Sequence, residues 1–151
     1  MKKIISLLVI FLSCHAFAGD DSEVFRALYE KEWDFRVQEF PSLTRGESNQ
    51  INPHRITHVS EKAQLRRYQF WSQIKRELAV ISCDKLDREA CINYRMFSRQ
   101  IHQFLADYET RAYLIPFNSD WGFYLSWSRW GEETDFNSIE DYRNYLSRLN
   151  A

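Results

Sequence analysis

The prolines and glycines of this chain fall between its patterned segments rather than inside them. All three prolines and three of the four glycines lie in two stretches, one from Pro41 to Pro53 and the other from Pro116 to Gly131. Proline ends a helix and glycine weakens one, so residues placed in this way separate helices. Apolar residues recur every three or four positions between them. We therefore predict an all-α fold.

Two long helices are predicted in the middle of the chain. Ser60 stands before an acidic first turn, as an N-cap does, and the apolar spacing that follows ends near Ser82. Asp87 has the place of the next N-cap, and its helix should continue until Pro116 approaches. Two long helices joined by a short turn predict an antiparallel hairpin.

A further helix is predicted on each side of this hairpin. Residues from about Asp21 to Phe40 follow helical spacing, although the stretch from Trp33 to Val37 alternates as a strand would. Ser138 and Asp141 resemble a capping box before a short C-terminal helix. Residues 19–151 are thus expected to form one helical domain, or the N-terminal segment of a larger one.

Residues 1–18 have the pattern of a cleavable signal peptide. Lys2 and Lys3 precede an apolar run from Ile4 to Leu12, and Ala16-Phe17-Ala18 is the small-x-small pattern at which a signal peptidase cuts. The run has about half of the roughly 20 residues that a membrane-spanning helix needs. The sequence therefore predicts export to the periplasm or beyond, with no transmembrane helix.

A second reading of the same segment makes Cys14 a lipidated cysteine. Leu12-Ser13-Cys14 ends the apolar run as a lipoprotein signal would, although Leu12 and Phe11 are larger than such signals prefer at these places. The alternative location is therefore a lipid anchor through Cys14.

The charge of the mature chain argues against two kinds of partner. Cleavage would leave 133 of the 151 residues, with 18 basic and 21 acidic side chains and a balance of −3. This balance is too small to suggest nucleic acid or an anionic membrane as a partner. It leaves the oligomeric state open.

Cys83 and Cys91 form the even pair that remains after cleavage. They flank a predicted turn between helices, so their Cα atoms could come within bridging range. An oxidising compartment would allow a disulfide, and two reduced cysteines are the other reading. His54 and His58 could in principle share a metal, but Pro53 and their polar neighbours indicate two solvated histidines in a loop. No cofactor or metal motif is found in the chain.

Aromatic residues gather after Pro116. Trp121 and its aromatic neighbours could stack on a ligand, and Asn118 could orient it, which makes these two residues the candidate substrate-binding positions. Helical spacing within the same segment, at Tyr124, Trp127 and Trp130, also fits packing in a core. Both readings stay open.

Several short segments of the chain, taken in order, form a distinctive set. They are Glu39-Phe40-Pro41, Leu86-Asp87-Arg88-Glu89, Asn93-Tyr94, Tyr113-Leu114-Ile115-Pro116-Phe117-Asn118, Glu140-Asp141-Tyr142 and Tyr145-Leu146-Ser147-Arg148-Leu149. Together they resemble the N-terminal region of the bacterial family called domain of unknown function 885, over about Val24 to Leu149. Two departures are Arg95, where the family tends to have an acid, and Phe117-Asn118-Ser119, where it tends to have glutamine, so the role of that amide position does not carry over.

The resemblance implies a longer, mainly helical, exported protein. Members of the family resemble zinc peptidases through a downstream His-Glu-x-x-Pro-Gly-His helix, which would supply metal ligands and a carboxylate base for a zinc-bound water. That motif is absent from this chain, so no catalytic or metal-binding role is carried over to any residue here.

Two functions are therefore expected as alternatives. The first is the N-terminal helical portion of a metallohydrolase-like exported protein, inactive alone, whose partner is the missing C-terminal part and whose full-length relatives hold zinc. The second is a small periplasmic module that uses the Trp-rich segment to bind peptides or glycans of the cell envelope.

Overall fold

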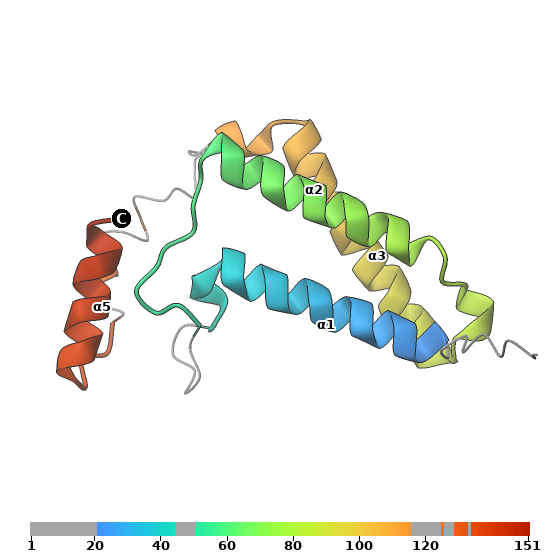
Figure 1. The fold of residues 1–151 in the computed structure, drawn as a ribbon, viewed down its shortest axis with the longest axis horizontal. Helices are drawn as coiled ribbons and strands as arrows, with labels where there is room; N and C mark the ends of the chain where they lie inside the picture. The colour runs from blue at the N-terminus through green and yellow to red at the C-terminus, as the bar shows by residue number, and fades with distance from the viewer. Residues whose placement is uncertain (1–20, 45–50, 116–124, 126–128, 133) are drawn as a thin grey trace, which may run out of the picture.

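The computed structural model describes residues 21–44, 51–115, 125, 129–132 and 134–151, and these form helices, turns and loops with no strand among them (Figure 1). The all-α prediction is confirmed. Short 3-10 helices connect the longer elements. The α-helices are α1 (Asp21–Glu39), α2 (Glu61–Leu78), α3 (Arg88–Glu109) and α5 (Ile139–Leu149), and the 3-10 helices are η1 (Pro41–Thr44), η2 (Cys83–Lys85) and η3 (Ala112–Leu114).

The helices begin where the capping residues predict. The Ser60 hydroxyl accepts a hydrogen bond from the Ala63 amide at 3.3 Å, and the Asp87 carboxylate accepts one from the Ala90 amide at 2.8 Å. Ser138 and Asp141 form a complete capping box at the start of α5. Each cap satisfies amide groups that have no partner inside the helix.

The two long helices end earlier than predicted. α2 stops at Leu78 instead of continuing to Ser82, because the chain turns there and brings Ile81 back into the core. α3 stops at Glu109, well before Pro116, because Arg111 adopts the left-handed conformation with φ of 57°. A left-handed residue is a common way to end a helix.

Helices α1, α2 and α3 form an up-down-up bundle. Tyr68 stacks on Tyr108, and Trp71 contacts Phe104 nearer the other end of α2, so α2 and α3 run antiparallel, as the predicted hairpin requires. Phe35 of α1 stacks on Phe70 of α2 with 3.7 Å between ring centroids. α1 therefore lies along the hairpin and completes the bundle.

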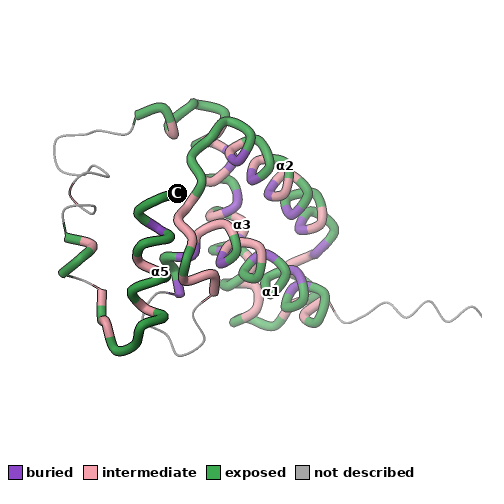
Figure 2. The backbone as a smooth tube through the Cα atoms, turned by 60° about the vertical axis from the view of Figure 1, so that its left-hand side comes forward, coloured by how far each residue is buried: buried purple, intermediate pink, exposed green. Residues whose placement is uncertain are grey.

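The core lies where the three helices face one another. Ile74 of α2 and Ile101 of α3 have no exposed surface, and the purple segments in Figure 2 mark the buried sides of the helices. Aromatic rings contribute much of the remaining packing, including Phe25 edge-on to Phe97 at 6.0 Å. α5 lies beside one end of this bundle (Figure 1) and takes no part in its core.

Candidate functional site

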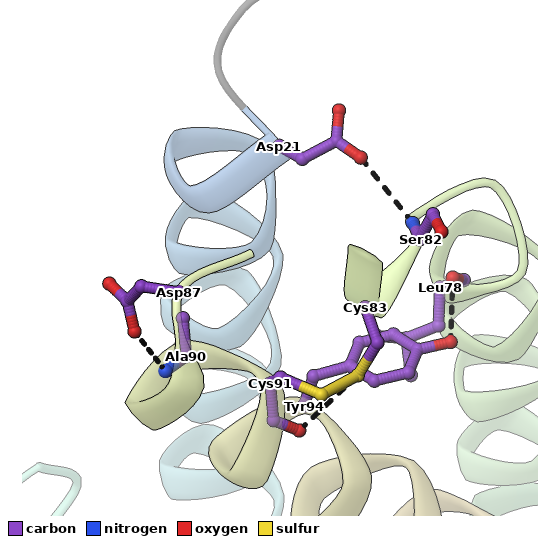
Figure 3. The surroundings of a disulfide bond; sticks show 8 residues. All are labelled: Asp21, Leu78, Ser82, Cys83, Asp87, Ala90, Cys91 and Tyr94. Atoms are coloured by element: carbon purple, nitrogen blue, oxygen red, sulfur yellow. Dashed lines mark hydrogen bonds between the residues drawn. A yellow bond between two sulfur atoms is a disulfide. The ribbon is translucent and has the colours of Figure 1, made fainter. Parts of the chain in front are cut away.

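Cys83 and Cys91 form a disulfide that joins η2 to the first turn of α3 (Figure 3). Their Cα atoms are 5.0 Å apart. The Tyr94 hydroxyl donates to the Leu78 carbonyl at 3.2 Å beside the bond, which ties the end of α2 to α3. The disulfide thus closes the turn of the α2–α3 hairpin. It contributes a structural link and leaves these two cysteines unavailable as thiolate ligands.

The predicted substrate-binding residues Asn118 and Trp121 lie outside the described residues, as do Cys14 and the predicted signal peptide, residues 1–18. The Trp-rich segment as a ligand platform stays a prediction.

The described histidines are exposed. His54 and His58 lie in the irregular segment before α2, as the loop reading predicts, and His102 lies on the exposed side of α3. Over the ranges that the structure describes, no group of three or more histidine, cysteine, aspartate or glutamate side chains is placed to hold a metal ion. Within those ranges no helix is both long and apolar enough to cross a bilayer.

An open groove of about 800 Å³ lies between α1 and α2. Val24, Ala27 and Leu28 line it from α1, and Val80 lines it from just beyond the end of α2. Lys31 Nζ donates to both carboxylate oxygens of Glu77 at 2.9 Å, and this ion pair also borders the groove. The groove could hold an apolar side chain of a ligand, with the ion pair available for polar contacts.

Glu32 is a buried carboxylate at the centre of the bundle. It has no exposed surface, and its Oε1 accepts a hydrogen bond from the Trp71 indole at 3.1 Å. Its Oε2 lies 3.2 Å from a guanidinium nitrogen of Arg36 without the geometry of a hydrogen bond. Burial raises the pKa of Glu32, and the charge of Arg36 and the indole hydrogen bond offset only part of that rise.

Arg36 is held by aromatic rings as well as by Glu32. Its guanidinium carbon lies 5.0 Å from the centroid of the Trp33 ring and 5.9 Å from that of Phe104. Both distances are within the range of a cation–π interaction. The Glu32–Arg36 pair therefore links α1 to α2 through the Trp71 hydrogen bond and to α3 through the Phe104 ring, an arrangement that fixes helix positions and offers no open position for a substrate.

Glu39 forms a second charged junction at the end of α1. Its carboxylate accepts hydrogen bonds from Arg66 at 2.7 and 3.0 Å and from Arg67 at 2.9 Å. Burial alone would raise the pKa of Glu39, but the two arginines outweigh it and hold that pKa below its usual value. Arg67 is itself buried, donates to the His58 carbonyl at 2.7 Å and lies 4.5 Å from the Phe40 ring centroid.

Sequence reasoning missed the structural roles of these two glutamates. Acidic side chains are normally exposed, so nothing in the apolar spacing marks Glu32. For Glu39, the sequence did contain a signal, because this residue belongs to the segment Glu39-Phe40-Pro41. In the structure α1 ends and η1 begins within that segment.

The short helix α5 turns its apolar side outward. Arg148, on the opposite side, is buried and donates from its guanidinium to the Pro53 carbonyl. The apolar residues of α5 stay substantially exposed, and Figure 2 shows most of the helix in green. Their exposed fractions are 73% for Ile139, 54% for Tyr142, 55% for Leu146 and 43% for Leu149.

The chain matches no protein-family model, no curated protein and no solved structure.

Proposed function

We propose that this chain is the N-terminal helical portion of an exported, metallohydrolase-like protein and that it contributes shape and binding surface rather than catalytic groups. The proposal starts from the likeness to the family called domain of unknown function 885. Catalytic zinc would reside on the downstream His-Glu-x-x-Pro-Gly-His helix of that family. The residues of this chain would support the helix that carries it.

The observation that carries the proposal is where the family-like segments fall in the fold. Glu39-Phe40-Pro41 lies at the junction of α1 and η1, where Glu39 binds Arg66 and Arg67. Leu86-Asp87-Arg88-Glu89 supplies the N-cap of α3, and Glu140-Asp141-Tyr142 lies in the first turn of α5. Residues that define helix ends constrain the whole backbone, so these three segments support a shared fold better than scattered apolar matches would.

The disposition of the charged groups also supports a non-catalytic role. Glu32 inside the bundle and Glu39 at the end of α1 are each paired with arginine. A general base must come within hydrogen-bonding distance of the substrate proton that it removes, and these two carboxylates are instead engaged with arginine. They act in holding α1 against α2.

Reading the coding sequence downstream of Ala151, in this gene or an adjacent one, tests the proposal. We expect a segment that encodes His-Glu-x-x-Pro-Gly-His within a mainly helical protein. A stop codon after Ala151 with no such segment nearby would count against it. Mass spectrometry of the mature N-terminus tests export in parallel: a chain that starts at Gly19 supports signal cleavage, and one that starts at a lipidated Cys14 supports the anchored form.

The groove between α1 and α2 favours a second candidate function, a small module that binds peptides of the cell envelope. Its apolar walls and the Lys31–Glu77 pair match a peptide with an apolar side chain and a backbone to be hydrogen-bonded. Methyl NMR of Val24 and Val80 during titration with a cell-wall stem peptide tests it. Shifts confined to the groove would support this function, and unchanged spectra would remove it.

A further inference from the structure

We propose that the outward side of α3 binds an acidic helix of another polypeptide through a line of three arginines, Arg88, Arg95 and Arg99, called here the basic row. All three side chains are exposed. The inference goes beyond the proposed function and does not depend on it. It follows from the position of the row on α3, from its electrostatics and from its spacing.

The basic row runs along α3 on the side away from the core. At 3.6 residues per turn its three positions lie within about 40° of one another around the helix, and they span about 16 Å of its length. The buried residues Phe97, Ile101 and Leu105 lie on the other side. One side of α3 therefore packs in the bundle, and the opposite side presents three guanidinium groups.

The basic row is unfavourable for α3 itself. Arg95 and Arg99 are four positions apart, a spacing at which like charges destabilise a helix. Arg88 is the first residue of α3, where the positive end of the helix dipole disfavours a cation. Within α3 no acidic residue stands three or four positions from any member of the row. The stability of the helix therefore does not explain the row.

The bundle does not neutralise the basic row. Among the residues that the structure describes, none of the three arginines forms an ion pair. The acids in the last turns of α3 are engaged elsewhere: Asp107 accepts a hydrogen bond from Gln103 at 2.8 Å, and Glu109 accepts one from Tyr68 at 3.2 Å. Three positive charges on one line are thus available to a partner, and charge complementarity selects an anionic one.

The number of arginines and the charge of the chain argue against two kinds of anionic partner. Recognition of anionic lipids commonly takes clusters of about four to eight basic residues, and the basic row has three. Domains that bind nucleic acid are commonly basic, with a pI above about 9. The sequence pI here is about 6.4. The carboxylates of an acidic polypeptide are the anions that remain.

The spacing of the basic row favours a helix as the carrier of those carboxylates. The row and Ile92 together follow steps of four, three and four residues, the repeat along which two α-helices stay in contact. Ile92 and Met96 are 49% and 67% exposed, so apolar contacts can accompany the charge pairs. A guanidinium can bind a carboxylate through two parallel hydrogen bonds. A partner helix with glutamate or aspartate at the same steps fits this side of α3.

A designed acidic peptide tests the inference. The probe is a labelled helical peptide of about three heptads with glutamate at alternating steps of four and three residues. A second peptide has the same composition in scrambled order. Fluorescence anisotropy measures their binding to the unchanged chain, to Arg95→Glu and to Lys75→Glu. Lys75 is the matched control, because it is exposed on α2 and its replacement makes the same change of charge.

We expect the ordered peptide to bind the unchanged chain and Lys75→Glu within about twofold of each other, and to bind Arg95→Glu at least about fivefold more weakly. The scrambled peptide should bind the unchanged chain at least about fivefold more weakly than the ordered one does. Arg95→Glu should also raise the urea midpoint of unfolding, because a glutamate four positions before Arg99 replaces repulsion with attraction. Weaker binding with a lowered midpoint would assign the row a structural role and overturn the inference.

Absence of binding to the ordered peptide at low salt, or equal binding by Arg95→Glu, would also overturn the inference. Equal binding of the scrambled peptide would overturn a helical partner. Tighter binding to a DNA duplex or to phosphatidylglycerol vesicles, lost in Arg95→Glu, would overturn the inference in favour of nucleic acid or a membrane.

Discussion

The buried pair of Glu32 and Trp71 allows a quantitative test of the bundle by a double-mutant cycle. Replacing Trp71 with phenylalanine removes the indole N–H that lies 3.1 Å from Glu32 Oε1, and replacing Glu32 with leucine removes the acceptor at similar volume. Both residues are buried. A hydrogen bond to a charged group contributes about 1.5 to 3 kcal/mol, and an unpaired buried carboxylate costs a comparable amount.

The cycle cancels the packing that each single change loses on its own. We expect Trp71→Phe to destabilise the unchanged chain by about 2 kcal/mol more than it destabilises the Glu32→Leu variant, a coupling measured by urea unfolding at pH 7. A coupling below about 0.5 kcal/mol would refute the described contact, because two groups that touch inside a core cannot be independent.

Three further predictions concern the stability of the bundle. Because burial raises the pKa of Glu32, the folded state holds the carboxyl proton more tightly than the unfolded state does. The Glu32 contribution to stability should therefore fall as the pH rises from the ordinary value of 4.5 through the raised pKa. Glu32→Gln should remove this slope above pH 4.5, whereas Glu77→Gln should leave it unchanged, because the pKa of the Glu77 carboxyl is lowered. Replacing Cys83 and Cys91 with serine opens a short loop and should cost roughly 2 to 3 kcal/mol in urea unfolding, and a change of less than about 0.5 kcal/mol would speak against the link. Ile101→Ala should cost about 2 to 5 kcal/mol because Ile101 has no exposed surface, while the exposed Ile139→Ala control should stay within about 0.5 kcal/mol, so equal effects at both positions would contradict the described core.

Much of the helical architecture could be predicted from local chemistry. Ser60, Asp87 and the Ser138–Asp141 pair mark helix starts because each side chain satisfies amides in its own first turn, an interaction within a few residues. The ends were harder to predict. Glycine and asparagine are the residues that usually adopt a left-handed conformation at a helix end, but here Arg111 adopts it. α3 therefore ends at Glu109, although the sequence predicts a longer helix.

The candidate surfaces depend on contacts between distant segments and could not be predicted in the same way. Apolar spacing shows that Tyr142, Leu146 and Leu149 share one side of a helix, but not whether that side meets the core or solvent. The orientation of α5 depends on Arg148 reaching the carbonyl of Pro53, which is 95 residues away. Burial of Glu32 likewise depends on α2 bringing Trp71 to it.

Peptide hydrolysis is the most direct test of the claim that this chain is a supporting portion of a metallohydrolase-like protein. A mixture of fluorogenic peptides is incubated with the chain plus zinc, with the catalytic portion of a longer relative plus zinc, and with both. We predict no turnover by the chain alone and a higher kcat/KM when the chain is added to the catalytic portion. Zinc-dependent turnover by the chain alone, or no effect of the chain on the catalytic portion, would contradict the claim.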